Sequence, residues 1–366
     1  MSTTVKNFSL EKIHLARKGL QGVVENTPLQ KNNYLSEKYE AAIFLKREDL
    51  QVVRSFKIRG AYNKIISLGN AAKKKSVVCA SAGNHAQGVA YSCAFLKIQG
   101  TIFMPLPTPK QKIEQVKWFG KNWVDVKLVG DTFDDCCREA MKFCESKKSF
   151  FIHPFDDEAV IEGQGTLALE LLEQSEPQID FLFIPIGGGG LAAGMASVFK
   201  TLSPKTKLIG VEPEGAPAMK KSLEAGKVIE LKKIDRFADG AAVKQVGQLS
   251  FSICKDLLDE VALVPEGKIC SAMLELYNRN AIIAEPAGTL SIAVLDQYKK
   301  AIKGKNVVCV LSGGNNDIGR MEEIKERSLV YEGLKHHFLV NFPQRAGALK
   351  EFVNNILADG TDITRF

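Results

Sequence analysis

The stretch FLFIPIGGGGLAAGMASVF, residues 181–199, carries no charge, and its length would suit a helix that crosses a membrane. Pro185 and the four glycines at 187–190 interrupt such a helix, because proline removes a backbone donor and glycine favours turns. The stretch therefore predicts a buried strand, a glycine turn and a second apolar helix. This strand–turn–helix unit decides the fold class.

The same design recurs on both sides of this stretch. Short apolar and β-branched runs are each followed by a turn and, in most cases, by a helical pattern; they occupy residues 76–80, 101–104, 125–129, 181–186, 207–211 and 307–311. Strands that alternate with helices predict parallel sheets covered on both faces. We expect an α/β protein with two open parallel-sheet units. The small unit would comprise residues 58–155, and the large unit residues 1–57 with 156–325.

Composition narrows the class of protein but not its function. The chain has 366 residues, of which 45% are hydrophobic and 25% charged, as in ordinary globular proteins. The formal net charge is 49 − 42 = +7, and the lysines are scattered in short groups. No segment interleaves basic and aromatic residues, so we expect neither a nucleic-acid partner nor a membrane partner. Eight cysteines without framework spacing predict reduced thiols and a cytoplasmic location.

The glycine turn is a candidate phosphate site. Successive glycines free several backbone N–H groups to point at one anion, and the following helix adds its positive dipole. A tight turn that only lets the helix pack on the sheet is the alternative. A dinucleotide site is a third interpretation, since Gly188, Gly190 and Ala193 fit G-x-G-x-x-A, and Glu212 ends the next strand.

A second candidate is Lys57 in the segment Ser55-Phe56-Lys57-Ile58-Arg59. A lysine in an apolar pocket has a depressed pKa and can form a Schiff base with an aldehyde. On the residues alone, a solvated lysine at a helix start is the more common situation.

Two further loops repeat the strand–loop–helix design. In the first, Ser81, Gly83 and Asn84 can offer donors to a carboxylate or a phenolic oxygen, although Ser81 or Asn84 could simply cap the helix. His85 could act as a base or only pack. In the second, Ser312 closes a buried strand, so its hydroxyl would face a cleft at the carboxyl edge of the sheet.

Taken together, these motifs resemble a known family. The segments SFKIRGA (55–61), SAGNHAQG (81–88), GGGGL (187–191) and SGGN (312–315) occur in the order and spacing of the threonine/serine dehydratases. These enzymes are fold type II pyridoxal-phosphate enzymes related to tryptophan synthase β. The resemblance covers residues 20–320.

The resemblance implies a role for each motif residue. Lys57 would bind pyridoxal 5'-phosphate covalently and act as the catalytic base. Ser312 would face the pyridine nitrogen, and Asn84 would bind the phenolic oxygen of the ring. The residues implied for the cofactor phosphate are Gly187, Gly188, Gly189, Gly190 and Leu191. Those implied for the substrate carboxylate are Ser81, Gly83 and His85.

The implied reaction is the deamination of L-threonine to 2-oxobutanoate and ammonia at the start of isoleucine synthesis, with L-serine as a weaker substrate. Related racemases have a serine where this chain has Ala82, and alanine cannot carry a proton, so a lyase is favoured over a racemase. Relatives that bind a cation use a glutamate and a nearby aspartate. This chain keeps Glu212 but has Ala218 at the second position, so we expect no metal, although Glu214 could replace the aspartate.

Two rival functions remain open from the sequence. A nicotinamide-dependent oxidoreductase would use Gly188, Gly190 and Glu212, but it explains neither Lys57 nor the two serine–asparagine loops. An amino-acid sensor without catalytic activity would keep the fold, and the intact Lys57, Asn84 and Ser312 argue against it. A homotetramer or homodimer is expected from the resemblance alone.

The C-terminal residues 326–366 predict a linker and part of a regulatory domain. We expect a strand at 337–342, a helix at 348–357 and the start of a strand at 362–366. FLVNFPQRAGAL, residues 338–349, resembles the beginning of the ACT-like regulatory domain of the biosynthetic members of the family. This resemblance implies isoleucine as an effector. Because an ACT domain usually has twice this many elements, we expect weakened or absent inhibition by isoleucine.

Overall fold

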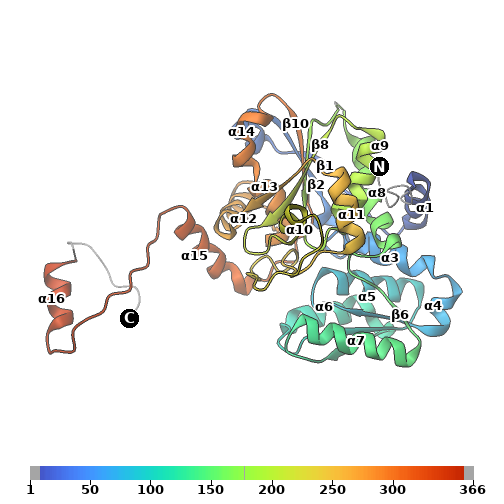
Figure 1. Cartoon of the computed structure of the whole chain (residues 1–366), viewed down its shortest axis with the longest axis horizontal. Coiled ribbons are helices and arrows are strands. Elements are labelled where there is room, and N and C mark those ends of the chain that lie inside the picture. Colours follow the sequence, from blue (N-terminus) through green and yellow to red (C-terminus); the bar gives the residue numbers. More distant parts are fainter. Residues whose placement is uncertain (1–8, 177, 358–366) are drawn as a thin grey trace.

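The computed structural model describes residues 9–176 and 178–357, and two β-sheets form its core (Figure 1). Within the described residues, the larger sheet has six strands, and β1 alone runs antiparallel to its neighbour. In sheet order the strands are β1 (Leu29–Lys31), β2 (Ala42–Arg47), β10 (Asn306–Leu311), β7 (Phe181–Pro185), β8 (Lys207–Pro213) and β9 (Glu260–Val264).

The smaller sheet has four strands, all parallel. In sheet order they are β5 (Val124–Leu128), β4 (Gly100–Met104), β3 (Val77–Ala80) and β6 (Phe150–Phe151). Every strand predicted before the C-terminal segment is present to within two residues of its expected bounds. The α/β fold with two parallel-sheet units is therefore confirmed.

Helices cover both faces of the larger sheet, which explains why its central strands are apolar throughout. On one face the core includes residues of α2 (Asn33–Tyr39), α12 (Glu266–Asn280), α13 (Pro286–Ala293) and α14 (Leu295–Ile302). On the other it includes residues of α1 (Leu10–Leu20), α8 (Glu158–Gln174), α9 (Gly190–Leu202), α10 (Ala218–Ala225) and α11 (Gln248–Leu257).

The smaller sheet is covered in the same way. Val77 and Cys79 of β3 pack in one core with α3 (Lys57–Ser67), α5 (Asn84–Leu96) and α6 (Lys110–Gly120). Val78 and Ala80 point to the opposite face, where they pack against α7 (Phe133–Lys147). The remaining short elements near these helices are α4 (Asn70–Lys75) and the 3-10 turns η2 (Glu48–Leu50) and η3 (Lys121–Trp123).

Residues 181–199 divide into β7, a glycine turn and α9, as the sequence predicted. In the part of the chain that the structure describes, no helix combines the length and the apolar character that a bilayer crossing requires. All eight cysteines are free thiols, and seven of them are buried.

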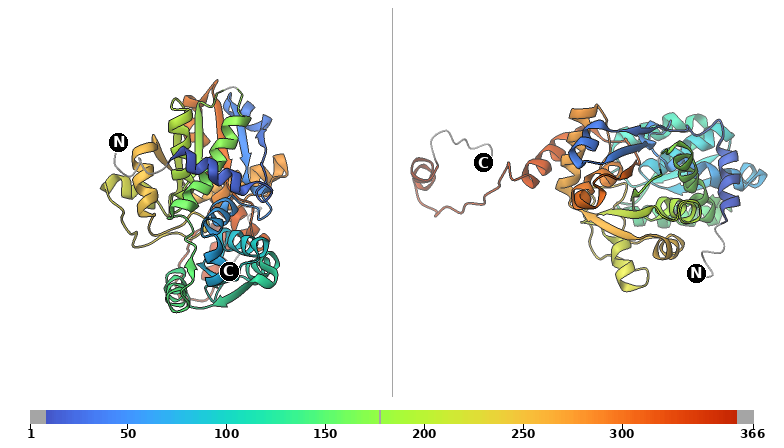
Figure 2. Two further views of the ribbon diagram at one scale, coloured as in Figure 1. Left: turned by 90° about the vertical axis from the view of Figure 1, so that its right-hand side faces the viewer. Right: turned by 90° about the horizontal axis from the view of Figure 1, so that it is seen from above.

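The C-terminal part leaves the body of the molecule (Figures 1 and 2). After η4 (Ile318–Arg320), α15 (Met321–Tyr331) packs on α12, and the chain then runs outward to α16 (Ala348–Asn355). The predicted helix is present, but the strand expected at 337–342 is not. No neighbouring strand is present among the described residues to complete its hydrogen bonds, and an unpaired strand is not stable. The strand expected at 362–366 lies outside the described residues.

Candidate active site

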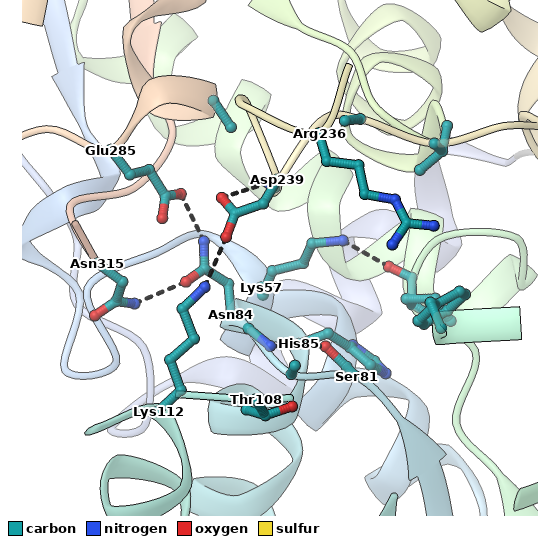
Figure 3. A pocket seen from close by; sticks show the side chains of 18 of the residues that line it. Lys57, Ser81, Asn84, His85, Thr108, Lys112, Arg236, Asp239, Glu285 and Asn315 are labelled. Carbon is teal, nitrogen blue, oxygen red and sulfur yellow. Dashed lines mark hydrogen bonds and ion pairs between the residues drawn. The ribbon is translucent and has the colours of Figure 1, made fainter. Parts of the chain in front are cut away.

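A cavity of about 680 Å³ lies where the carboxyl ends of strands from both sheets meet (Figure 3). Ser81 follows β3, Pro105 follows β4 and Ser312 follows β10, and all three line the cavity. Ligands bind at this edge of open parallel sheets because loops and helix N-termini converge there. Each of the four sequence motifs contributes residues to this cavity; among them are Lys57, Ser81, Ala82, Gly83, Asn84, His85, Gly188 and Ser312.

Lys57 is the first residue of α3, and its side chain points into the cavity (Figure 3). Its Nζ donates a hydrogen bond of 2.8 Å to the carbonyl oxygen of Pro154. Burial lowers the pKa of Lys57 to about 8, although the carboxylate of Glu285 partly opposes this effect. A substantial fraction of the amine is therefore neutral near physiological pH, which makes it a nucleophile and a base.

Backbone pairing brings Ser312 close to Lys57 although 255 residues separate them in the sequence (312 − 57 = 255). Phe56 N donates to Ser312 O at 3.2 Å, and Gly314 N donates to Arg54 O at 2.9 Å. Ser55 and Gly313 form an antiparallel bridge between these two contacts. Ser312 is 3% exposed, and its hydroxyl has no partner among the described residues, so it can bond to a ligand.

The start of α3 is fixed by a buried ion network that the sequence analysis missed. Arg59 is fully buried and binds two carboxylates, Glu48 at 2.8 Å and Glu170 at 2.6 Å. The Nζ of Lys46 also lies 2.8 Å from Glu170. Arg59 is two residues beyond Lys57, so the network holds the turn of helix that carries the lysine. Arg59 was itself the available sequence signal for this network, because it is a charged residue inside an apolar helix pattern.

The glycine turn packs closely against Phe155 and leaves no room for side chains at Gly188 and Gly190. A Cβ added to Gly188 would lie 2.2 Å from a ring carbon of Phe155, and one on Gly190 would lie 2.6 Å from its carbonyl oxygen. Gly189 has φ = 97°, a conformation that glycine adopts without strain. Helix α9 begins here without a side-chain cap, so backbone N–H groups remain available for an anionic ligand.

The five residues predicted for the phosphate do not all face the cavity. Gly188 lines it, whereas Gly187, Gly189, Gly190 and Leu191 are not among its lining residues. The side chain of Leu191 is 4% exposed and belongs to the core beneath the larger sheet. Any contribution from Leu191 to an anion must therefore come from its backbone N–H.

Asn84 begins α5, and both ends of its amide are engaged. Its Oδ1 accepts a hydrogen bond of 2.8 Å from Asn315, and its Nδ2 donates one of 2.6 Å to Glu285 (Figure 3). Helix α5 has no side-chain cap, so the interpretation of Ser81 or Asn84 as a helix cap is wrong. Ser81 instead accepts a hydrogen bond of 3.2 Å from Gly83 N within the loop.

His85 lines the cavity, but its ring is committed to the protein. Its Nε2 lies 2.9 Å from the carbonyl oxygen of Ile152. Burial, with a smaller contribution from the Lys57 cation, lowers the pKa of His85 to about 3. The ring is neutral at physiological pH and donates its Nε2 proton to that carbonyl.

Glu285 is a second residue that the sequence analysis missed. It precedes α13 directly, is 6% exposed and lines the cavity. Burial and the nearby Asp239 raise the pKa of Glu285 to about 7, while the hydrogen bond from Asn84 opposes them. The sequence signal was the segment Ala284-Glu285-Pro286, in which a glutamate follows an apolar run and precedes a helix-starting proline.

The dinucleotide interpretation fails at Glu212. This residue is 1% exposed, and its carboxylate accepts hydrogen bonds from the backbone N–H groups of Met219 and Lys220, at 2.7 and 2.8 Å. Glu212 is therefore not free to bind a ribose, and it does not line the cavity. Within the described residues, no three or more His, Cys, Asp or Glu side chains are grouped to hold a metal ion.

Comparison with known proteins identifies the family. Residues 20–313 match the model of the pyridoxal-phosphate-dependent enzymes, and residues 326–366 match that of the C-terminal regulatory domain of threonine dehydratase. The chain is 60% identical to the biosynthetic L-threonine dehydratase of Halalkalibacterium halodurans, over 98% of this chain and 86% of that protein. It is 58% identical to the corresponding protein of Bacillus subtilis, over 100% of this chain and 87% of that protein.

The chain belongs to the pyridoxal-phosphate-dependent enzymes, in the family of the biosynthetic threonine dehydratases. Solved structures of related family members agree. Threonine deaminase isoform 2 of Solanum lycopersicum has a TM-score of 0.82 at 39% identity, over 87% of this chain and 94% of that one. Maize serine racemase has a TM-score of 0.81 at 31% identity, over 89% and 99%.

The described residues fit pyridoxal phosphate, the cofactor of this family. The cavity offers a lysine with a lowered pKa for the aldehyde and a glycine cradle in which a Cβ would clash. Asn84 offers an amide for a ring oxygen, and Ser312 offers a hydroxyl without a partner among the described residues. A donor set of this kind suits a phosphorylated aromatic aldehyde.

Proposed function

We propose that this chain converts L-threonine to 2-oxobutanoate and ammonia, the first step of isoleucine biosynthesis, and L-serine to pyruvate more slowly. The observation that carries the proposal is Lys57, whose pKa is lowered to about 8 in a cavity that Gly188 of the glycine turn also lines. The names of the similar proteins from Halalkalibacterium halodurans and Bacillus subtilis support the choice of threonine.

Lys57 is the catalytic residue in this proposal. Its amine would hold the cofactor through the aldehyde group, and with substrate bound the neutral amine would take the α-proton as a base. The carbonyl oxygen of Pro154, 2.8 Å from Nζ, holds the ammonium in place while the proton resides there. Pyridoxal phosphate, when bound, delocalises the negative charge that develops on the α-carbon. In the net reaction the β-hydroxyl leaves with a proton as water, and a second water enters on hydrolysis, so that L-threonine gives 2-oxobutanoate and ammonia.

Other residues orient the reactants. Backbone N–H groups of the glycine turn, from Gly187 to Leu191, hold the phosphate at the start of α9. Ser312 would offer a neutral hydroxyl to the pyridine nitrogen, which would leave this nitrogen unprotonated and limit the electron withdrawal by the ring. Asn84 would donate to the phenolic oxygen. Ser81, Gly83 and His85 form the loop before and at the start of α5 that receives the substrate carboxylate; His85 contributes its backbone, since its ring binds Ile152.

The cavity supports a lyase better than a racemase. A racemase must deliver a proton to the face of the α-carbon opposite the lysine, and in this chain Ala82 lies in the loop where related racemases have a serine. Alanine cannot supply that proton, so L-threonine and L-serine are the substrates. Incubation with L-serine followed by chiral chromatography tests this point, and formation of D-serine would contradict it.

The activity itself has a direct test. The purified protein, incubated with pyridoxal phosphate, should show a visible absorption band and should form 2-oxobutanoate from L-threonine. Lys57→Ala should abolish the band and reduce turnover by at least 10³-fold, because its methyl group cannot bond to the aldehyde or carry a proton. A protein that binds the cofactor but forms no 2-oxobutanoate would favour a sensor.

We also propose the division into a large catalytic unit (1–57 and 156–325), a small unit (58–155) and a regulatory segment (326–366). In this proposal the enzyme is a cytoplasmic homotetramer or homodimer, and isoleucine is its effector, with inhibition that is weakened or absent in this chain. The match of residues 326–366 to a regulatory domain supports the effector. Assays with and without isoleucine test the regulation, and analytical ultracentrifugation tests the oligomeric state.

A further inference from the structure

Asn315 lies next to Asn84 at the edge of the cavity, and its side chain is held from two directions (Figure 3). Its Nδ2 donates to the carbonyl oxygen of Val53 at 2.9 Å and to Oδ1 of Asn84 at 2.8 Å. The Nδ2 of Asn84 in turn donates to Oε1 of Glu285 at 2.6 Å. The four groups therefore form a single chain of hydrogen bonds.

The direction of this chain is set at its first member. A backbone carbonyl can only accept a hydrogen bond, so Asn315 must turn its Nδ2, and not its Oδ1, towards Val53. The second N–H of the same nitrogen then faces Asn84, which must present its Oδ1. The Nδ2 of Asn84 is thereby directed to the opposite side, towards Glu285 and the cavity.

This direction matters because an amide has a donor end and an acceptor end. Asn84 can bind a phenolate oxygen only through Nδ2, and with Glu285 bound to one N–H, the second N–H has no partner among the described residues. The flipped amide would place a carbonyl oxygen against the Glu285 carboxylate and against the ring oxygen. Without Asn315, the hydrogen bond from Nδ2 to Glu285 would be the one described side-chain contact that opposes this rotation.

The backbone keeps Asn315 in place next to the lysine. Gly314 N donates to Arg54 O at 2.9 Å, and Glu285 N donates to Gly313 O at 3.2 Å. A Cβ on Gly313 would lie 2.2 Å from Oε1 of Glu285, so the loop and the glutamate are in close contact. The loop that carries Asn315 therefore contacts the segment before Lys57 on one side and Glu285 on the other. These are the two ends of the hydrogen-bond chain.

We propose that Asn315 is a positioning residue that fixes the amide of Asn84 with Nδ2 towards the phenolic oxygen of the cofactor. The proposal rests on the proposed function, because it takes pyridoxal phosphate as the ligand and Asn84 as its partner. It assigns Asn315 no contact with the substrate or the cofactor. Its effect on the cofactor must therefore pass through Asn84.

A double-mutant cycle tests this dependence. The variants are Asn84→Ala, Asn315→Ala and the pair, and the readouts are the dissociation constant for pyridoxal phosphate added to the apoprotein and the visible absorption maximum of the bound cofactor. Asn315→Ala should raise the dissociation constant about tenfold and shift the maximum, as expected for the loss of one charge-assisted hydrogen bond. In the Asn84→Ala background the same change should have less than a twofold effect.

Asn306→Ala is the control. It shortens an asparagine at the amino end of β10, opposite the end that leads to Ser312, where Nδ2 donates to the carbonyl oxygen of Gln178 at 3.1 Å. Asn306 does not line the cavity, so this change should leave the dissociation constant within twofold. Circular dichroism and thermal melting of the apoproteins report on folding. If Asn315→Ala does not fold, Asn315→Ser replaces it with the same expectation, since serine is too short to bridge Val53 and Asn84.

The outcomes separate the two proposals. Equal effects of Asn315→Ala with and without Asn84 would overturn the positioning role and leave the proposed function intact. An unchanged dissociation constant in Asn84→Ala would also overturn it. A wild-type apoprotein that binds no pyridoxal phosphate would overturn the proposed function and the positioning role together.

Discussion

The lowered pKa of Lys57 gives a prediction for cofactor binding to the apoprotein. With a pKa of about 8, about half of the Lys57 amine is neutral at pH 8, compared with about one in 300 for an ordinary lysine. Only the neutral amine attacks an aldehyde, so the association rate of pyridoxal phosphate should rise with pH and level off above about 8. Stopped-flow absorbance measures this rate. A midpoint above pH 10 would contradict the buried environment of Lys57.

Gly188 gives a second prediction at the scale of one residue. In Gly188→Ala the new methyl group would lie 2.2 Å from the ring of Phe155, so the glycine turn that we propose for the phosphate must distort. We expect the dissociation constant of the cofactor to rise at least tenfold. Phe155→Ala removes the ring atoms concerned, and the double variant should recover part of the affinity. If the double variant binds no better than Gly188→Ala, the clash with Phe155 is not the cause.

At the scale of elements, the Arg59 network stabilises the start of α3. Arg59→Ala would leave the carboxylates of Glu48 and Glu170 buried with Lys46 as their remaining cation. Removing one partner of a buried ion pair costs about 3–5 kcal/mol, so the free energy of unfolding should fall by about this amount. Urea denaturation measures it. Arg138→Ala breaks the exposed Arg138–Asp135 pair within α7, and its unfolding midpoint should stay at the wild-type value.

The strands that the sequence predicted have strong local signals, whereas β2 and β9, of six and five residues, were not predicted although they too are largely apolar. β3 and β7 are continuous apolar runs between turn residues, and both were located. β1 and β6 have three and two residues, too few to show a period, and their pairing depends on distant strands. The strand expected at 337–342 had the local signal but lacks a neighbour among the described residues, which shows that pairing, not propensity, decides a strand.

The same distinction applies to the candidate site. Lys57 and the glycine turn could be singled out because each lies in one short motif. The role of Glu285 and Asn315 could not be predicted in this way, because it arises from contacts with Asn84, which is 201 and 231 residues away in the sequence. The proline after Glu285 marks a helix start, but nothing local indicates that these side chains form one network.

At the scale of the whole molecule, two ion pairs connect helices of the smaller sheet to the loop between α10 and α11. Lys112 of α6 lies 2.6 Å from Asp239, and Lys244 lies 3.1 Å from Asp134 of α7. The same loop lines the cavity through Arg236, Gly240 and other residues. The pairs therefore hold together two parts of the chain that enclose one site.

Weakening these pairs should loosen the loop without unfolding either sheet. In Lys112→Met/Lys244→Met, we expect faster hydrogen exchange of amides in residues 230–245, because local opening no longer breaks two ionic contacts. In the wild type, 0.5 M NaCl should have the same effect, since salt screens partly exposed charges. Mass spectrometry of peptic peptides measures the exchange. Lys221→Met, which breaks the exposed pair with Glu224 inside α10, is the control and should change nothing in this loop. Equal exchange in the double variant and the wild type would show that backbone packing alone holds the loop over the cavity.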